Sequence, residues 1–216
     1  MTDEEILKNV LDELKWDSRL SPTEIGVTVK DGVVSLVGTV DSYMKKWQAE
    51  EVALRVRGVR AVANELEVKL GESDERDDEA LARAAKLALE DASDIPSSVT
   101  VTVDNGWITL RGDVEWQFQR QSAERKIRNL RGVKGVINTI EVKPKMKPED
   151  LKRKIENALI RAAETDAKRI QVEVQDGRVV LKGKVHSWYE KEEAKREAWL
   201  APGVRDVVDE LRIAFD

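Results

Sequence analysis

Hydrophobic and polar positions alternate strictly in three stretches of the chain that share one layout. In each stretch an alternating run leads to an Asp-Gly or Asn-Gly pair, and a second alternating run follows, within residues 25–36, 99–110 and 170–181. A period of two is typical of a strand with one buried face. An Asp-Gly or Asn-Gly pair between two such runs is typical of a two-residue hairpin turn, because both turn positions need positive φ. The sequence therefore predicts three β-hairpins that turn at Gly32, Gly106 and Gly177.

Helical periodicity flanks each predicted hairpin. Before the hairpins, apolar residues recur every fourth position, at 6, 10 and 14, at 80, 84 and 88, and at 151, 155 and 159. After the hairpins, positions 49, 53 and 56, positions 123, 127 and 130, and positions 194, 198 and 201 each fall on one helix face. A last alternating run follows within residues 62–68, 136–142 and 207–213. Two glycine sets recur, one within the second hairpin strand (Gly38, Gly112, Gly183) and one as the predicted C-terminal cap of the second helix (Gly58, Gly132, Gly203).

The repeated order is helix, strand, strand, helix, strand. It predicts an α+β fold of three tandem small α-β-β-α-β units, each a three-stranded mixed sheet with two helices on one face. The predicted domains span residues 1–71, 72–145 and 146–216, and short linkers lie at 71–77 and 143–148. At the first helix of two units, Thr2 with Glu5 is typical of a capping box, and Pro148 is typical of a first helical residue.

Composition narrows the chemistry further. The chain has a formal net charge of -5, no cysteine and a single histidine. The acidic balance disfavours a nucleic-acid partner. No Ser-His or Cys-His arrangement and no phosphate-binding glycine loop is present, and His186 fits a capping or surface role. The sequence therefore predicts a protein that is not an enzyme, with no catalytic residue, no cofactor and no metal ligand.

The N-terminal stretch is acidic and amphipathic, and it lacks the features of a secretory leader. No apolar run is long enough to span a bilayer. These features predict a cytoplasmic protein as the sequence is written, soluble or peripheral to a membrane. Removal of a leader would instead place the protein in the periplasm.

The repeated unit resembles the BON domain, a bacterial module named for osmotically induced and nodulation proteins. In the first copy the resemblance rests on Asp31, Gly32, Leu36, Gly38, Val40, Gly58, Val59, Val62 and Asn64. The later copies carry equivalents, except that Asp209 stands where Asn64 and Asn138 stand in the others. The resemblance implies a non-enzymatic adaptor that binds phospholipid or attaches to membranes in osmotic stress. One relative in the family links such a domain to potassium binding.

The second copy has a basic helix within residues 116–131 and aromatic residues at its start. The candidate lipid-binding residues are Trp116, Phe118, Arg120, Arg125, Lys126, Arg128 and Arg131. A basic helix beside aromatic residues suits anionic phospholipid, and it suits nucleic acid less well. The alternative is a solvated helix whose cations pair with acidic neighbours.

A second apolar stripe marks the corresponding helices of the first and third copies. It comprises Tyr43, Trp47 and Leu54 in the first copy and Trp188 and Trp199 in the third, and Trp107 lies on the outer strand face of the second. The stripe either packs between repeats or binds a protein partner, as a chaperone-like scaffold would. A third hypothesis is binding of K⁺ or Ca²⁺ by acidic loops such as residues 74–79. The alternative for that loop is a solvated linker with a helix N-cap.

Overall fold

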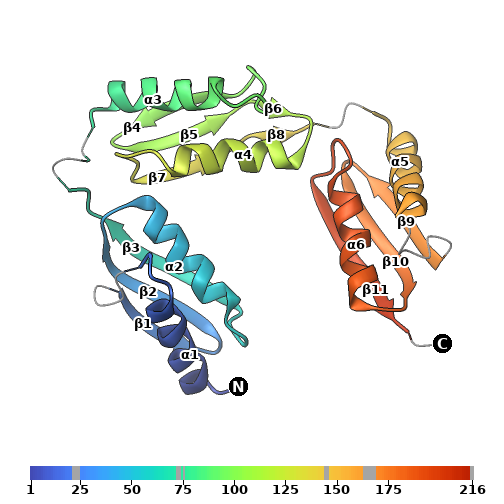
Figure 1. Ribbon diagram of the computed structural model, residues 1–216, viewed down its shortest axis with the longest axis horizontal. Helices are drawn as coiled ribbons and strands as arrows, with labels where there is room; N and C mark the ends of the chain where they lie inside the picture. Colours follow the sequence, from blue (N-terminus) through green and yellow to red (C-terminus); the bar gives the residue numbers. More distant parts are fainter. Residues whose placement is uncertain (21–24, 72–73, 75, 144–145, 163–168, 215–216) are drawn as a thin grey trace. The chain divides into compact units, whose positions relative to one another are not determined.

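The computed structural model describes all residues except 21–24, 72–73, 75, 144–145, 163–168 and 215–216. The described elements repeat one order three times (Figure 1). The first repeat consists of α1 (Asp3–Trp16), β1 (Ile25–Lys30), β2 (Val33–Val40), α2 (Tyr43–Arg55) and β3 (Ala61–Val68). The second consists of α3 (Asp78–Glu90), β4 (Thr100–Asp104), β5 (Trp107–Arg111), β6 (Asp113–Val114), α4 (Gln117–Arg128), β7 (Gly135–Asn138) and β8 (Glu141–Val142). The third consists of α5 (Pro148–Arg161), β9 (Ile170–Gln175), β10 (Arg178–Val185), α6 (Trp188–Trp199) and β11 (Asp206–Ile213).

Each repeat is built on a small sheet. In the first, β2 pairs antiparallel with β1 and parallel with β3. In the third, β10 pairs in the same way with β9 and β11. The second repeat has the strand order β4-β5-β7 and a separate two-stranded sheet, β6-β8, which follows where β5 and β7 end.

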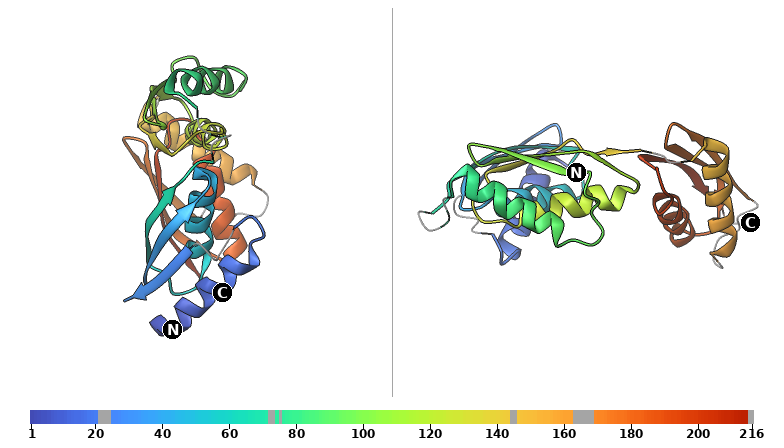
Figure 2. Two further views of the ribbon diagram at one scale, coloured as in Figure 1. Left: turned by 90° about the vertical axis from the view of Figure 1, so that its left-hand side faces the viewer. Right: turned by 90° about the horizontal axis from the view of Figure 1, so that it is seen from above.

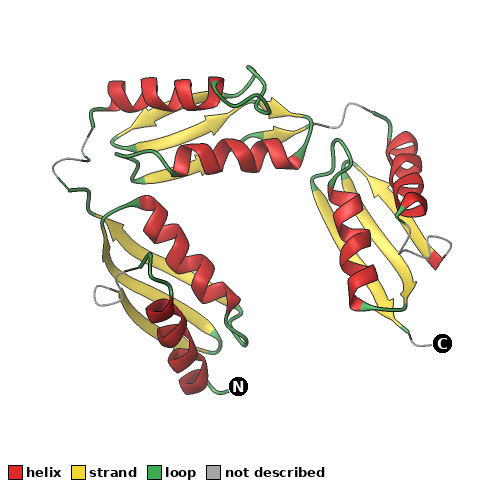
Figure 3. Ribbon diagram, in the orientation of Figure 1, coloured by secondary structure: helices red, strands yellow, loops and turns green. Residues whose placement is uncertain are grey.

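Both helices of a repeat cover the same face of its sheet (Figure 3). For α1 and α2 this is also clear in the left view of Figure 2, where the blue helices lie on one side of the blue and teal strands. The predicted α+β class with three repeated units is confirmed.

By spatial proximity the chain groups into two compact units, and the second repeat contributes to both. One unit comprises Met1–Ala88, Val101–Thr109 and Arg125–Ile137, and the other comprises Leu89–Thr100, Leu110–Glu124 and Asn138–Asp216. The domain boundaries at 71/72 and 145/146 stay a prediction. Parts of both predicted linkers, residues 72–73, 75 and 144–145, lie outside the described residues.

The first helix of each repeat buries the residues at the third, seventh and eleventh positions after its first residue. These are Ile6, Val10 and Leu14 on α1, and Leu151, Ile155 and Leu159 on α5, as predicted. On α3 the prediction of Ala80, Ala84 and Ala88 is wrong by one residue, because Leu81, Ala85 and Leu89 form the buried face. Leucine buries more apolar area than alanine, so the face that carries the leucines is the more stable one against the sheet.

The three hairpin turns have the predicted backbone. Asp31 and Gly32 have φ of 53° and 76°, and the other two turns have nearly the same values. The glycines predicted as helix caps lie further on. Val56 is the C-cap of α2, and Gly58 follows in a turn in which the Val59 N–H donates to the Val56 carbonyl. The prediction of Gly58 and Gly203 as cap residues is therefore wrong in detail, and that of Gly132 stays a prediction.

Those glycines instead lie against the hairpin turns. A Cβ on Gly32 would approach the Gly58 carbonyl oxygen to 3.0 Å, and one on Gly177 would approach that of Gly203 to 2.6 Å. Arg60 donates its N–H to the Gly32 carbonyl at 2.8 Å. Lys134 and Arg205 donate in the same way to the carbonyls of the other two turn glycines. Each turn glycine therefore serves both the hairpin and its contact with the segment that follows the second helix.

The N-terminal ends of α1 and α6 are capped by side chains, and α5 begins with proline. The capping box of Thr2 and Glu5 is present on α1, and Pro148 is the first residue of α5. Ser187, not His186, is the N-cap of α6: its hydroxyl accepts from the Glu190 N–H, while the Glu190 carboxylate accepts from the His186 N–H at 2.6 Å. His186 therefore has a structural place next to the cap.

The C-terminal end of α1 has a carboxylate whose pKa can be tested. The Arg19 side chain donates from Nε to Asp17 Oδ1 at 2.8 Å, and this hydrogen bond lowers the pKa of Asp17 to about 2. Because the folded-state pKa lies below the unfolded value, this stabilisation is present above about pH 4 and is lost as the pH falls through 2. We expect Arg19→Gln to raise the pKa of Asp17 towards 3.8, as followed by carboxyl-carbon NMR titration. An unchanged titration in Arg19→Gln would contradict this assignment.

An asparagine fastens the last strand to the second helix in two repeats. Asn64 Nδ2 donates to the Lys46 carbonyl and to Glu50 Oε2, both at 3.0 Å. Asn138 makes the same bonds to the Arg120 carbonyl at 3.1 Å and to Glu124 Oε2 at 3.0 Å. In both repeats the asparagine Oδ1 accepts the backbone N–H two residues later. The asparagine thus fixes the helix against the strand through donor and acceptor at once.

The third repeat makes this connection with reversed polarity. Asp209 replaces the asparagine, and Lys195 stands where Glu50 and Glu124 stand. The Asp209 carboxylate lies 3.1 Å from Lys191 Nζ and 4.0 Å from Lys195 Nζ, and it still accepts the Leu211 N–H at 3.0 Å. The departure at Asp209 is therefore matched by a compensating change on α6.

Candidate functional site

The predicted basic helix corresponds to α4, and the structure divides its cations into two groups. Arg120 lies against its own repeat and donates to the Asn138 carbonyl at 3.3 Å. The Arg128 guanidinium lies 3.7 Å from the centre of the Trp47 ring, in cation–π geometry. Both are half-buried, whereas Arg125 and Lys126 are exposed. Of the four basic side chains on α4, the structure leaves Arg125 and Lys126 best placed to meet an external anion.

Arg131 follows α4 and is also well exposed. Its Nε lies 3.9 Å from Asp74 Oδ1, and 77% of its side chain is accessible. A pair at that separation and exposure contributes little, because solvent screens it. The predicted pairing of basic residues with acidic neighbours thus applies to Arg131 only weakly.

Two aromatic residues stand at the start of α4. The Trp116 and Phe118 ring centres are 6.1 Å apart at an interplanar angle of 33°. Phe118 is 49% exposed, and Arg125 lies seven residues further on, which is the same helix face. The single acidic residue of α4, Glu124, accepts from Asn138. The exposed face of α4 therefore combines an aromatic ring with cations.

The apolar stripe of the first repeat is only partly exposed. Trp47 and Tyr43 are half-buried, and Leu54 is 47% exposed. In the third repeat Trp188 is 66% exposed, whereas Trp199 packs against the core of its own repeat. The predicted stripe is thus not a single surface in the third repeat. Tyr189, which the sequence pattern did not indicate, is 59% exposed next to Trp188.

Trp107 has a local explanation. A Cβ built on Gly135 would lie 2.4 Å from Trp107 Cε3, so the indole covers the backbone of that glycine on β7. An aromatic ring over a glycine on the neighbouring strand supplies the packing that glycine lacks. The ring is still 47% exposed, so it belongs to the surface of its own sheet. Trp107 therefore stabilises the second repeat whether or not it also contacts a partner.

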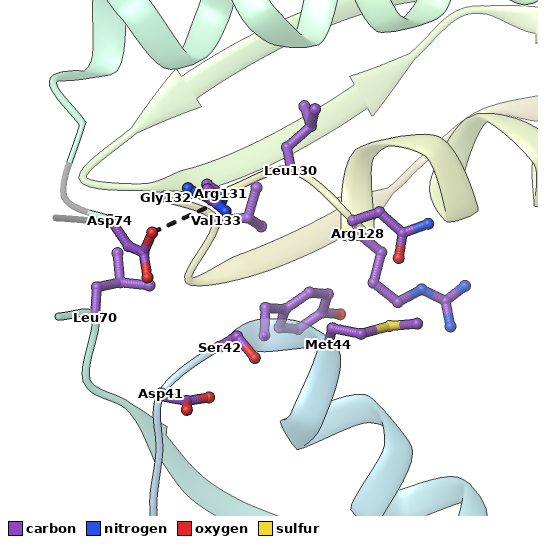
Figure 4. Close-up of a pocket in the computed structure, with 12 residues that line it drawn as sticks. Asp41, Ser42, Met44, Leu70, Asp74, Arg128, Leu130, Arg131, Gly132 and Val133 are labelled. Carbon is purple, nitrogen blue, oxygen red and sulfur yellow. Dashed lines mark ion pairs between the residues drawn. The ribbon is translucent and has the colours of Figure 1, made fainter. Parts of the chain in front are cut away.

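A pocket of about 210 Å³ lies in the first compact unit (Figure 4). Its lining comes from the start of α2, including Ser42 and Tyr43, and from the residues that end and follow α4, including Arg128 and Arg131. The Arg131–Asp74 ion pair borders it, as the dashed line shows. The pocket also contains Asp41, whose pKa is lowered by a hydrogen bond from Lys45. Two of the carboxylates that line the pocket, those of Asp41 and Asp74, are therefore already paired with basic side chains.

The acidic run at 74–79 has identifiable structural roles. Asp77 Oδ1 accepts the Ala80 N–H at 2.6 Å and so caps α3. Glu75 lies outside the described residues. In the described part of the chain, no group of three or more His, Cys, Asp or Glu side chains is arranged to hold a metal ion. No described helix combines the length and apolar character that a membrane span requires.

A carboxylate at the first helical residue binds the hairpin turn in two repeats, which sequence analysis did not predict. Asp3 accepts the N–H groups of Asp31 and Gly32 at 2.7 and 3.0 Å. Asp78 accepts those of Asn105 and Gly106 at 2.7 and 2.9 Å. The signal in the sequence is an aspartate 28 or 27 residues before the turn.

Three consecutive α-β-β-α-β units define a tandem-repeat protein of the α+β class. A comparison with protein-family models matches the BON domain three times, over residues 2–69, 77–144 and 148–214. The chain therefore belongs to the BON domain family, as its sequence pattern predicted.

Two curated proteins are similar over much of their length. Osmotically-inducible protein Y of Escherichia coli (strain K12) is 30% identical over 148 residues, which cover 66% of this chain and 74% of that protein. An uncharacterized protein in the gshII 5′ region of Anaplasma centrale is 30% identical over 125 residues, covering 56% of this chain and 83% of its own. Among solved structures, the C-terminal domain of CdsD, a structural protein of the type III secretion system of Chlamydia trachomatis, aligns with 99% of this chain and all of its own. That alignment has 12% sequence identity and a TM-score of 0.29.

Proposed function

We propose that this chain is a non-enzymatic BON adaptor that associates with anionic phospholipid through α4, in an envelope or osmotic-stress role. The observation that carries the proposal is the exposed face of α4, where Phe118 and Arg125 lie two turns apart with Lys126 beside them. The similarity to a protein named as osmotically inducible supports the stress context.

The charge of α4 distinguishes it from the equivalent helix of the third repeat. α4 carries four basic residues and one acidic residue, whereas α6 carries three basic and four acidic. Each Lys or Arg near an anionic membrane contributes about 1 kcal/mol, and an inserted aromatic ring adds an apolar term. Two exposed cations with one aromatic ring predict weak, reversible and salt-sensitive binding.

Charge reversal on α4 tests this function. We expect Arg125→Glu to lower co-sedimentation of the full chain with anionic vesicles at least fivefold, because it removes about 1 kcal/mol of attraction and adds repulsion. Arg196→Glu is the matched control, since it makes the same charge change at the equivalent position of α6. Binding of the unmodified chain should weaken from low to moderate salt and be absent with zwitterionic vesicles.

Two outcomes would contradict the lipid function. One is equal binding of the Arg125→Glu and Arg196→Glu variants to anionic vesicles. The other is absence of vesicle binding by the unmodified chain at low salt.

A second candidate function is supported by the exposed aromatic pair on α6. Trp188 and Tyr189 are adjacent at its start and are 66% and 59% exposed, next to acidic side chains. Adjacent exposed aromatic residues are typical of the anchor positions of protein interfaces. Failure of the chain to bind vesicles would favour this protein-binding function over lipid association.

A further inference from the structure

The third repeat lacks the carboxylate that binds the hairpin turn in the other two. The first residue of α1 is Asp3 and that of α3 is Asp78, but α5 begins with Pro148. The register is the same, because all three helices bury the third, seventh and eleventh residues after the first. In the first and third repeats the distance along the chain to the turn aspartate is also identical, at 28 residues. Proline thus occupies the position from which an aspartate would reach the turn.

The turn itself keeps its donor geometry in the third repeat. Asp176 and Gly177 have φ of 47° and 78°, compared with 53° and 76° at Asp31 and Gly32. Successive N–H groups in such a conformation converge on one point and form an anion-binding concavity. Within the described residues, no hydrogen bond from the N–H of Asp176 or Gly177 is recorded. The two amides of the third repeat that correspond to those bound by Asp3 therefore have no hydrogen-bond acceptor among the described residues.

Arg205 borders this turn, and Lys147 directly precedes Pro148 in the sequence. A Cβ on Gly177 would lie 3.1 Å from Arg205 Cγ and 3.4 Å from its Nε, so the Arg205 side chain runs along the turn. Arg60 has the same place beside Gly32, where a carboxylate is bound. Lys147 is the N-cap of α5 and makes no side-chain cap hydrogen bond. The N–H groups at the start of α5 add a positive partial charge on the same side.

The acidic side chain within the turn does not prevent binding. Asp176 has its counterpart in Asp31, and Asp3 still binds the amides of Asp31 and Gly32 at 2.7 and 3.0 Å. The first repeat thus shows that the site accepts a carboxylate in the presence of the turn aspartate.

We propose that the hairpin turn at Asp176 and Gly177 binds an Asp or Glu side chain of a partner protein. The incoming carboxylate takes the place that Asp3 and Asp78 take in the other repeats, and Arg205 and Lys147 add electrostatic attraction. This site is separate from α4 and does not rest on the lipid function. It gives the third repeat a recognition role that the first two cannot have, because their turns are filled from within.

Amide NMR of the full chain tests this site, with acetate as the probe. At neutral pH, acetate should move the amide protons of Asp176 and Gly177 downfield in a saturable way, relative to chloride at equal ionic strength. Gly32 and Gly106 serve as internal controls and should not respond, because Asp3 and Asp78 occupy their turns. Equal shifts at all three turn glycines would overturn the proposal. So would a response to inorganic phosphate without one to acetate.

Two variants separate the site from a general salt effect. Pro148→Asp should move the Gly177 amide downfield without acetate and abolish its response, because it supplies the missing carboxylate. Asp3→Asn should make the Gly32 amide responsive to acetate. A Pro148→Asp variant that still responds like the unmodified chain would overturn the proposal. A Glu149→Gln variant whose Gly177 amide moves upfield without acetate would do the same, because the neighbouring Glu149 would then be the acceptor.

Discussion

Replacement of Gly183 by alanine is expected to unfold the third repeat while the first stays folded. Gly183 has φ of 131°, and an added Cβ would lie 2.0 Å from the Arg169 carbonyl oxygen. Backbone strain and forced displacement of the neighbouring strand each contribute a few kcal/mol, on the order of 4 kcal/mol together. A domain of about 70 residues is stable by roughly 4–10 kcal/mol, so this substitution removes much or all of its stability.

Hydrogen–deuterium exchange of the full chain measures the effect repeat by repeat. Peptides from β9, β10 and β11 should lose protection in Gly183→Ala, whereas those from β1 and β2 should keep it. The matched control is Gly71→Ala, since a Cβ there meets nothing within 4 Å and its φ is ordinary. That variant should stay within about 0.5 kcal/mol of the unmodified chain. Normal protection of β10 in Gly183→Ala would show that the strand can shift to admit a methyl group.

The glycines of the three hairpin turns illustrate why the fold was predictable from the sequence. An Asp-Gly or Asn-Gly pair between two alternating runs is typical of a turn whose two residues have positive φ, and the structure has positive φ at all three pairs. Because the pattern occurs three times, the elements predicted for one repeat can be compared with those predicted for the other two. The helix α3 is the exception. Its sequence has apolar residues at 80, 84 and 88 and again one position later, where two of the three are leucines, so periodicity alone allows two buried faces.

The candidate sites were less predictable, because the sequence does not show which basic and aromatic side chains contact other residues of the same chain. Arg120 and Arg128 look like Arg125 in the sequence, yet one bonds to β7 and the other covers Trp47. Trp107 shares the apolar character of the stripe residues, and its ring lies over Gly135 of its own sheet, which the sequence did not indicate. In each case the partner is distant in the chain, and only the folded structure brings the two residues together.

A second large effect on the free energy of unfolding is expected at the contact between Asp209 and Lys195, which joins the last strand of the third repeat to α6. Lys195→Glu would place a second carboxylate beside Asp209, whose side chain is only 18% exposed. Like charges about 4 Å apart near a protein surface repel by several kcal/mol before relaxation, and the attraction of Lys195 is lost as well. We expect a loss of about 2 kcal/mol in unfolding free energy, measured by urea-dependent amide exchange in β10 and β11.

The double variant Lys195→Glu with Asp209→Asn should recover most of that loss. It recreates the Asn–Glu pair that fastens the strand to the helix at Asn64 with Glu50 and at Asn138 with Glu124. Lys191 keeps its bond to the Leu211 carbonyl, just as Lys46 bonds to that of Leu66 beside Asn64. Recovery would give a coupling energy of about 2 kcal/mol between positions 195 and 209. Simple additivity of the two single changes would instead mean that the polarity of the connection does not matter. The Asn–Glu contact of the first two repeats and the Asp–Lys contact of the third would then stabilise their repeats independently of which side carries the negative charge.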